Sequence, residues 1–305
     1  MAVAKQPSDD ARPHWSVSQL NQFLNICSLQ YWFGRVAKID KETLSANLLF
    51  GSAVHETISC IYGHMRSGSS LTPPQAADAF AADWELRVKL AQVPVAYSGK
   101  DSYESLLNKG QVMIQHFMEK LDPQEHVVSV DQRFNVPLIA PDGRALEKPL
   151  LGYFDLVVQR PSKERVVVDF KTASKRYTDS KIDNDLQSVG YAYAASLLFD
   201  QAEVDFEWRV LLKTKAPDFE TYSTSLSRPD FERFAWLAQV VEHAVNAKAY
   251  LPNTQSFYCT TCPYRQACRD WHRGRTKTTV PVRAAPSPQR PAAPATAAAY
   301  ANAAR

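Results

Sequence analysis

Three charged residues, Asp155, Asp169 and Lys171, interrupt two apolar segments in the middle of the chain. Asp155 lies in LLGYFDLVVQ, and the other two lie in VVVDFKT. Apolar strands seldom bury charges unless those charges are paired or bind a ligand. The three residues therefore indicate a polar site built on two neighbouring strands.

The spacing of these residues suits metal-assisted hydrolysis. Side chains alternate between the two faces of a strand, so Asp169 and Lys171 should point the same way, about 7 Å apart. Val168 and Phe170 should then point the other way. A carboxylate binds a hard divalent cation, and a neighbouring lysine orients water or neutralises charge that builds up on a phosphate. Asp155 would add a second carboxylate from the adjacent strand.

An Asp-x-Lys triplet also has a simpler explanation. The chain contains a second one, Asp179-Ser-Lys181, in a polar segment where nothing suggests a site. For an isolated triplet, an ion pair on an edge strand is the favoured explanation. The position of Asp169 and Lys171 near the end of an apolar strand, with Asp155 on the strand before it, favours the catalytic interpretation.

Three polar residues on predicted helices are further candidates. His55, in FGSAVHE, lies near the start of a helix, although a lone helical histidine is more often a core residue than a ligand. Gln187 and Tyr191 are four residues apart, on one face of the helix that follows VVVDFKT. Taken alone they would be a solvent-facing glutamine and a core tyrosine. Beside a phosphate site they could hold a nucleic-acid backbone or the lysine.

The five cysteines are unevenly distributed. Cys259, Cys262 and Cys268 form a C-x2-C-x5-C group, which is typical of a metal or cluster site. A fourth ligand would be Cys27 or Cys60. Cys60 falls in the middle of a predicted apolar helix and is expected to pack in the core. Spacing alone allows either zinc or an iron–sulfur cluster.

Composition and charge exclude several classes of protein. The chain has 305 residues, of which 45% are apolar and 22% charged, as in a soluble globular protein of one large domain or two small ones. No apolar run approaches the roughly 18 residues that span a bilayer. The first residues lack the apolar core of a secretory signal, so we expect a cytoplasmic protein without a membrane partner, in which disulfides are not expected.

The net charge of +3 arises from the end of the chain. Residues 275–305 contain five basic residues and no acidic one, which leaves 30 basic and 32 acidic residues in 1–274. Any contact with nucleic acid must therefore come from a local basic surface. The Pro/Ala-rich composition of 275–305 predicts a disordered tail.

Hydrophobic periodicity predicts an α/β protein. Helical spacing and caps at Ser16, Thr72 and Ser227 predict helices, and alternating or short apolar runs predict strands. The predicted helices are 16–36, 51–68, 72–92, 101–121, 183–199 and 228–250, and the strands are 127–139, 150–159, 166–172, 204–214 and 219–227. This order indicates a sheet flanked by helices, with a large helical N-terminal portion.

Taken together, the motifs resemble a known family. S-x-S-x-L followed by a cysteine, G-x-x-x-H, G-Y-x-D, D-x-K-T, Q-x-x-x-Y and C-x2-C-x5-C occur in this order between Ser16 and Cys268. The set resembles the RecB-like branch of the PD-(D/E)XK nuclease superfamily, especially its iron–sulfur members, the AddAB-type nuclease domains and the CRISPR-associated adaptation nucleases. The resemblance implies a restriction-endonuclease-like mixed sheet flanked by helices, with a C-terminal cysteine cluster.

The resemblance also implies roles for individual residues. His55, Asp155, Asp169 and the main-chain carbonyl of Phe170 would bind Mg²⁺ or Mn²⁺, and Lys171 would position or activate the attacking water. The catalytic set would be completed by Gln187 and Tyr191, which would orient the substrate and the active-site groups. A structural 4Fe-4S cluster would be ligated by Cys27, Cys259, Cys262 and Cys268, with Zn²⁺ as the alternative.

The sequence departs from the pattern of this family at two positions. Ser28 follows the first cysteine where many relatives have proline, and Asp169 stands where many superfamily members have glutamate. Neither change removes a ligating or catalytic group. We expect a flexible segment 1–13, a RecB-like nuclease domain 14–274 that includes a helical insertion 71–122 and the cysteine cluster 259–268, and the tail 275–305.

The expected function is metal-dependent hydrolysis of DNA, with exonuclease action on single strands or duplex ends favoured by analogy. DNA repair and recombination, phage DNA metabolism and CRISPR adaptation are all compatible settings. A helicase, recombinase or integrase partner is plausible because the chain has no P-loop. Two alternatives remain open: a non-catalytic DNA-end-binding or assembly subunit that retains the fold, and a zinc-stapled regulatory protein.

Overall fold

The structure is a computed structural model that describes residues 13–214 and 217–277. Residues 1–12 of the predicted flexible segment 1–13 lie outside the described residues. So do residues 278–305 of the predicted tail 275–305. The chain divides between Ala267 and Cys268 into two compact units. The first unit contains the sheet and the candidate active site.

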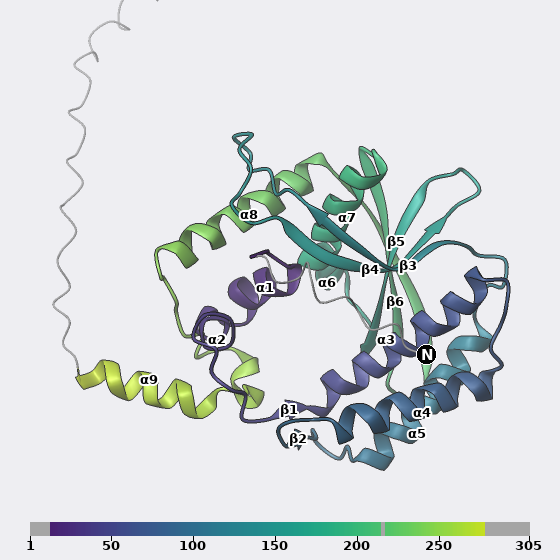
Figure 1. Ribbon diagram of the computed structural model, residues 1–305, viewed down its shortest axis with the longest axis horizontal. Coiled ribbons are helices and arrows are strands. Elements are labelled where there is room, and N and C mark those ends of the chain that lie inside the picture. Colours follow the sequence, from purple (N-terminus) through teal and green to yellow (C-terminus); the bar gives the residue numbers. More distant parts are fainter. Residues whose placement is uncertain (1–12, 215–216, 278–305) are drawn as a thin grey trace, which may run out of the picture. The chain divides into compact units, whose positions relative to one another are not determined.

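A mixed five-stranded sheet in the order β3-β4-β5-β6-β7 forms the centre of the first unit (Figure 1). Neighbouring strands are antiparallel except for β5 and β6, which are parallel and are joined through helix α7, as a parallel pair requires. The strands are β3 (His126–Val136), β4 (Leu150–Gln159), β5 (Arg165–Ala173), β6 (Glu203–Leu212) and β7 (Asp218–Ser227). The predicted mixed central sheet is confirmed.

The helices follow the predicted order with some differences in their ends. They are α1 (Val17–Asn21), α2 (Ser28–Tyr31), α3 (Ala46–Arg66), α4 (Pro73–Lys89), α5 (Tyr103–Glu119), α6 (Asp179–Asp183), α7 (Leu186–Phe199), α8 (Arg228–Asn246) and α9 (Arg265–Lys277). Short π-helical segments Gln22–Ile26 and Trp32–Val36 follow α1 and α2, and a 3₁₀ turn covers Phe257–Thr261. Two short parallel strands, β1 (Leu44–Ser45) and β2 (Val95–Ala96), form a separate pair.

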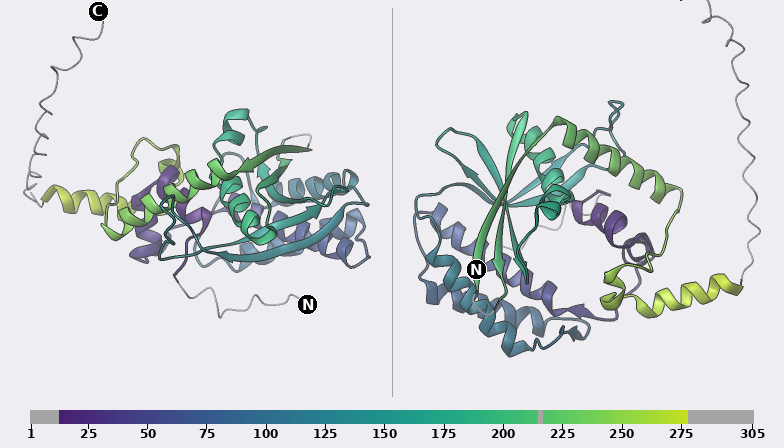
Figure 2. Two further views of the ribbon diagram at one scale, coloured as in Figure 1. Left: turned by 90° about the horizontal axis from the view of Figure 1, so that it is seen from above. Right: turned by 180° about the vertical axis from the view of Figure 1, so that it is seen from behind.

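Helices cover both faces of the sheet, and each face has its own core (Figures 1 and 2). On one face, Phe206 and Trp208 of β6 belong to a cluster with residues of α1, α7 and α8. On the other face, Val168 and Phe170 of β5 belong to a cluster with residues of α3, α4 and α5. Segment 71–122, which matches no motif, therefore provides two of the three helices that bury the second face.

The local sequence explains the main helix boundaries. Thr72 caps α4 by accepting the main-chain N–H of Gln75, and Pro73 occupies the first turn, where its missing N–H is not needed. Ser16 caps α1 by accepting the N–H of Gln19. Both caps were predicted from the sequence. Within residues 13–214 and 217–277, no helix has both the length and the apolar composition that crossing a bilayer requires.

Three expectations are corrected by the structure. The predicted helix 16–36 is interrupted at Cys27, whose extended backbone (φ −172°, ψ 119°) separates the π-helical segment from α2. Helix α3 begins at Ala46, so His55 lies in its third turn and not near its start. Cys60 was expected in the core, but it lies on an exposed face of α3, because the buried stripe of this helix includes its neighbours Ile61 and Tyr62 and not Cys60.

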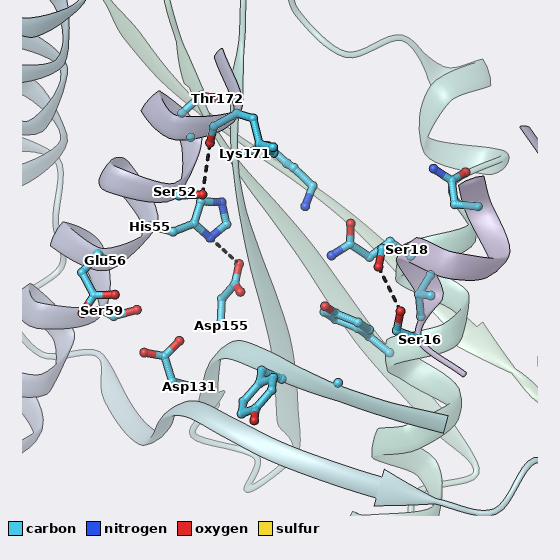
Figure 3. A pocket seen from close by; sticks show the side chains of 18 of the residues that line it. Ser16, Ser18, Ser52, His55, Glu56, Ser59, Asp131, Asp155, Lys171 and Thr172 are labelled. Carbon is cyan, nitrogen blue, oxygen red and sulfur yellow. Dashed lines mark hydrogen bonds and ion pairs between the residues drawn. The ribbon is translucent and has the colours of Figure 1, made fainter. Parts of the chain in front are cut away.

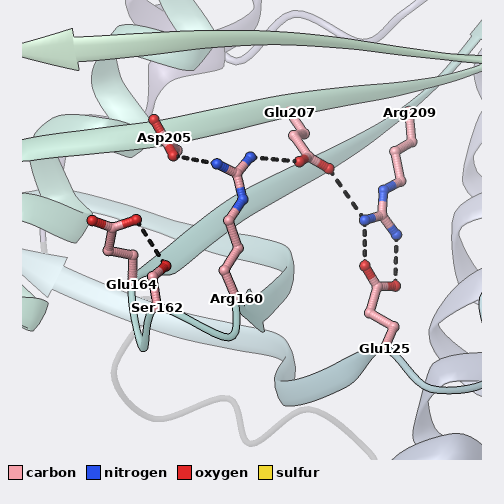
Figure 4. A network of polar contacts seen from close by, with 7 residues as sticks. All are labelled: Glu125, Arg160, Ser162, Glu164, Asp205, Glu207 and Arg209. Atoms are coloured by element: carbon pink, nitrogen blue, oxygen red, sulfur yellow. Dashed lines mark hydrogen bonds and ion pairs between the residues drawn. The ribbon is translucent and has the colours of Figure 1, made fainter.

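Arg209 of β6 connects α3 to the sheet. Its guanidinium donates to both carboxylate oxygens of Glu125 and to Glu207 (Figure 4), and also to the hydroxyl of Tyr62 on α3 over 2.7 Å. The Tyr62 ring packs against Phe170, with ring centroids 5.7 Å apart. A charged group that is 11% exposed is tolerated here because acceptors surround it. These contacts fix the helix that carries His55 against the strand that carries Asp169.

Candidate active site

Strands β4 and β5 separate at the site. Their paired residues end at Leu156 and Val168, whereas β4 stays paired with β3 as far as Leu150 and β5 stays paired with β6 as far as Ala173. The sheet therefore forks, and residues of both branches line a cavity of about 830 Å³. The fork explains why polar residues can lie inside otherwise apolar strands.

Most of the candidate residues meet at this cavity. His55, Asp155, Lys171, Gln187 and Tyr191 all line it, and Figure 3 shows His55 pointing from α3 towards Asp155. Asp169 does not line the cavity. It lies directly behind Lys171, with 1% of its side chain exposed. The three charges in the two apolar strands are thus brought together as the sequence predicted.

The Asp169 carboxylate is held at both oxygens. Lys171 Nζ lies 2.6 Å from Oδ2, and Gln187 Nε2 donates to Oδ1 over 2.7 Å. Burial raises the pKa of Asp169 to about 6, because the Lys171 ammonium only partly offsets burial and the charge of Asp155 adds to it. The side chain of Gln187, which could have faced solvent, instead turns inward to an acidic residue.

Asp155 is linked to both α3 and β5. Its Oδ2 accepts the main-chain N–H of Phe170 over 2.9 Å and lies 3.2 Å from His55 Nδ1. Burial opposes ionisation of Asp155, but the bond to His55, the nearby charges of His55 and Lys171, and the Phe170 N–H together lower its pKa. Burial likewise opposes protonation of His55, and the Asp155 carboxylate outweighs it, so the pKa of His55 is raised.

Lys171 and Tyr191 complete the polar wall. The Lys171 side chain is 26% exposed and reaches the cavity. Burial would lower its pKa, but the carboxylates of Asp169 and Asp155 raise the pKa above the usual value. Burial, followed by the same two carboxylates, raises the pKa of the Tyr191 phenol. At neutral pH the site therefore presents an ammonium group and a neutral phenol.

The ligand atoms at the cavity are of the kinds that bind a hard divalent cation, but the side chains that carry them form ion pairs with other residues, as His55 does with Asp155. Carboxylate oxygens and an imidazole nitrogen suit Mn²⁺, and carboxylates with a main-chain carbonyl suit Mg²⁺. Among the residues that the structure describes, no group of three histidine, cysteine or acidic side chains is arranged to hold a metal ion. The roles of His55, Asp155, Asp169 and the Phe170 carbonyl as ligands stay predictions.

Three of the predicted cluster cysteines lie in the first unit. The Cys27 sulfur caps α2 by accepting the N–H of Gln30 and also accepts the N–H of Asn253, each over 3.4 Å. The amide of Gln30 donates to the Cys262 sulfur over 3.4 Å. Burial raises the pKa of Cys259, and the nearby Cys27 and Cys262 raise it further. Cys27 and Cys259, which are 232 positions apart in the sequence, are thus close enough to interact electrostatically.

Cys268 belongs to the second unit. It lies on α9, and its side chain is half-buried. The arrangement of the described cysteines does not amount to a metal-binding group. Ligation by all four cysteines therefore stays a prediction from the resemblance.

Sequence reasoning missed several polar residues of the cavity. Asp131 of β3 lines it, and the flanking pairs Val130–Leu156 and Gln132–Phe154 place Asp131 across from Asp155. Its φ of 48° lies in the left-handed region, which non-glycine residues rarely adopt. The signal available in the sequence was an acidic residue inside the alternating strand VVSVDQRF.

Asp185 was missed as well. It lines the cavity, caps α7 by accepting the N–H of Gln187 over 2.9 Å, and accepts the indole N–H of Trp208 over 2.7 Å. The predicted helix 183–199 contained Asp185, whereas α7 begins at Leu186 with Asp185 as its cap. Nothing in the sequence indicated its tryptophan partner.

Comparison with known proteins gives a family and a fold. A model of the PD-(D/E)XK nuclease superfamily matches residues 14–269. A solved structure from Eubacterium rectale, described as a "putative exonuclease", aligns with 81% of this chain and 87% of its own at 14% identity, with a TM-score of 0.51. A second solved structure, of the protein SSO0001, aligns with 83% of this chain and 95% of its own at 11% identity, with a TM-score of 0.37. No curated protein sequence matches this chain.

Proposed function

Because the chain belongs to the PD-(D/E)XK nuclease superfamily, we propose that it is a metal-dependent deoxyribonuclease of the RecB-like branch. The observation that carries this proposal is the meeting of Asp155, Lys171 and Gln187 on one cavity, with Asp169 directly behind. The E. rectale structure with the same fold is described as a "putative exonuclease", which supports action from DNA ends.

The proposal assigns a task to each side chain. Asp155, Asp169, His55 and the carbonyl of Phe170 would hold Mg²⁺ or Mn²⁺. A bound cation of this kind would lower the pKa of a water molecule and neutralise charge on the scissile phosphate. Lys171 supplies a second positive charge beside the phosphate and orients the attacking water, and Gln187 keeps the Asp169 carboxylate in place.

The dimensions of the cavity favour a single strand as the substrate. A volume of about 830 Å³ lies within the range of roughly 300–1,000 Å³ that is usual for small-molecule pockets. One unpaired strand end can enter a cavity of this volume and reach Asp155 and Lys171, which line it. We therefore propose hydrolysis of single-stranded DNA or of frayed duplex ends.

We also propose that the cysteines ligate a structural 4Fe-4S cluster, with Zn²⁺ as the alternative. The support is the electrostatic contact among Cys27, Cys259 and Cys262, together with N–H donors that point at the Cys27 sulfur. Such donors stabilise a thiolate. DNA repair and recombination, phage DNA metabolism and CRISPR adaptation all suit this activity, and a helicase, recombinase or integrase would be its partner.

The decisive experiment is digestion of end-labelled DNA by the purified protein. Single-stranded and duplex substrates labelled at either end are incubated with Mg²⁺ or Mn²⁺, and the products are resolved by length. We expect metal-dependent shortening of single strands that stops on addition of a chelator. The Asp155→Asn variant should be inactive, whereas Asp179→Asn, in the second Asp-x-Lys triplet, should cleave as the wild type does.

The opposite result would identify a different function. Wild-type protein that retains DNA ends in a gel-shift assay but leaves them uncut with either metal would contradict the nuclease proposal. It would favour the non-catalytic DNA-end-binding subunit. Equal loss of cleavage in Asp155→Asn and Asp179→Asn would show that the assay reports folding and not the site.

A further inference from the structure

The helix that carries Gln187 is attached to the sheet at its first turn by a hydrogen bond that plays no part in the proposed chemistry. The indole N–H of Trp208 on β6 donates to Asp185 Oδ2 over 2.7 Å. Trp208 is fully buried, and the Asp185 side chain is half-buried at the edge of the cavity. A buried indole N–H needs an acceptor, and a carboxylate is a strong one.

The other oxygen of the same carboxylate holds Gln187. Asp185 Oδ1 accepts the main-chain N–H of Gln187 over 2.9 Å. The side chain of that residue donates to Asp169 Oδ1 over 2.7 Å. Asp185 therefore fixes the backbone position from which the Gln187 amide reaches the buried carboxylate.

These bonds close a ring around the site. Trp208 is the partner of Asp169 in the parallel pairing of β5 and β6. The ring runs from Asp169 across the strand pair to Trp208, from its indole to Asp185, and through Gln187 back to the Asp169 carboxylate. A displacement of the start of α7 would break the ring at the contact between Gln187 and Asp169.

We propose that Trp208 and Asp185 are positioning residues that hold the amide of Gln187 against Asp169 and thereby set the orientation of that carboxylate towards a divalent cation. The effect on the cation rests on the proposed function. The effect on the position of the Gln187 amide is independent of that function. Partners beyond the direct ligands orient metal-binding carboxylates in many sites, and their loss weakens metal binding.

Two variants separate the indole bond from the helix cap. Trp208→Phe removes the N–H donor and keeps an aromatic ring in the core. Asp185→Ser keeps a good capping side chain for the N–H of Gln187, but its single, shorter oxygen cannot serve the indole as well. If Trp208→Phe fails to fold, Asp185→Ser still tests the link, because it leaves the core unchanged.

The chain offers a matched control for the loss of a buried tryptophan. Trp84 on α4 is fully buried in the core on the other face of the sheet. Its indole nitrogen makes no hydrogen bond within the part of the chain that the structure describes. Trp84→Phe therefore repeats the change in volume without the loss of a bond to α7.

The primary measurement is the NMR signal of the Gln187 side-chain amide, assigned by its disappearance in Gln187→Ala. We expect it to shift towards the solvent-exposed position in both Trp208→Phe and Asp185→Ser, and to stay in place in Trp84→Phe. Calorimetric titration with Mn²⁺ should show roughly tenfold weaker binding in the two variants, the lower end of the loss that is typical for partners of metal ligands. The double variant should be no weaker than either single variant.

The two proposals fail in different ways. An unchanged Gln187 signal in Trp208→Phe, or the same shift in Trp84→Phe, would overturn the positioning role. So would a double variant whose effects simply add. A wild-type protein that binds no Mn²⁺ would contradict the proposed function, and the amide signal would still decide whether Trp208 and Asp185 hold Gln187.

Discussion

The main-chain N–H of Phe170 donates to Asp155 Oδ2 over 2.9 Å, at the point where the pairing of β4 and β5 has ended at Leu156 and Val168. A side chain of β4 thus takes the place of a main-chain acceptor. The same carboxylate lies 3.2 Å from His55 on α3. Asp155 is therefore both a part of the sheet at its fork and a part of the candidate site.

This double role predicts different effects for two substitutions of Asp155. Asparagine retains an oxygen that can accept the Phe170 N–H, so Asp155→Asn should remove activity with little loss of stability. Alanine leaves that N–H without its acceptor, which costs about 1–3 kcal/mol. Asp155→Ala should therefore be inactive and also less stable by that amount, as measured by urea unfolding. Equal stabilities of the two variants would show that the Phe170 bond contributes little.

Gly190 should be required for the close packing of α7. A Cβ atom at this position would lie 2.6 Å from Val17 Cγ2 and 2.8 Å from Phe234 Cζ, on the neighbouring helices α1 and α8. Gly190→Ala should lower the free energy of unfolding by about 1–3 kcal/mol. It should also reduce cleavage, because it displaces the helix that carries Gln187.

Gly63 on α3 is the matched control for this substitution. A Cβ atom there would meet nothing within 4 Å. Alanine is the better helix former, so Gly63→Ala should raise stability by about 0.5–1 kcal/mol. A destabilised Gly63→Ala, or a neutral Gly190→Ala, would contradict the packing argument.

Arg209 should contribute far more to stability than Arg160, although both belong to one network (Figure 4). Arg209 is 11% exposed and bonds to Glu125, Glu207 and Tyr62, so Arg209→Ala leaves the Glu125 carboxylate, which is only 15% exposed, without its partner. We expect a loss of about 3 kcal/mol in urea unfolding. Arg160 is 42% exposed, and Arg160→Ala should cost less than about 1 kcal/mol. Similar losses would mean that burial does not determine the strength of these ion pairs.

The metal content of cysteine variants tests the proposed cluster. Protein purified without oxygen should be brown, with about four iron and four sulfide per chain if one 4Fe-4S cluster is bound. Cys27→Ser should lose the metal. Cys60→Ser, which changes an exposed cysteine outside the group, should keep it. A colourless protein with one zinc per chain would establish the alternative, and a metal-free wild type would exclude both.

Local patterns in the sequence were sufficient to predict the strands and helices. They also predicted the face of the strand or helix on which each candidate residue lies. The period of two in VVVDFKT placed Val168 and Phe170 in one core, away from Asp169 and Lys171. The spacing of Gln187 and Tyr191 placed both on one face of α7, and both line the cavity. These inferences succeeded because they depend only on the geometry of a single strand or helix.

The same patterns failed where contacts between distant segments decide the outcome. Cys60 stands among apolar residues of α3, yet it is exposed, because only one stripe of a helix can face the core. The break at Cys27 leaves its sulfur to accept the N–H of Asn253, more than 200 residues later. Neither result follows from neighbouring residues.

The amino-acid sequence alone indicates the chemical groups and the strands and helices that carry them. The contacts between these groups follow only from the tertiary structure: the fork between β4 and β5 that opens beside Asp155, the inward turn of Gln187, and the bond between Trp208 and Asp185. The reason is physical. Periodicity fixes a side chain relative to its own element, whereas strand register and helix packing depend on burial summed over the whole chain.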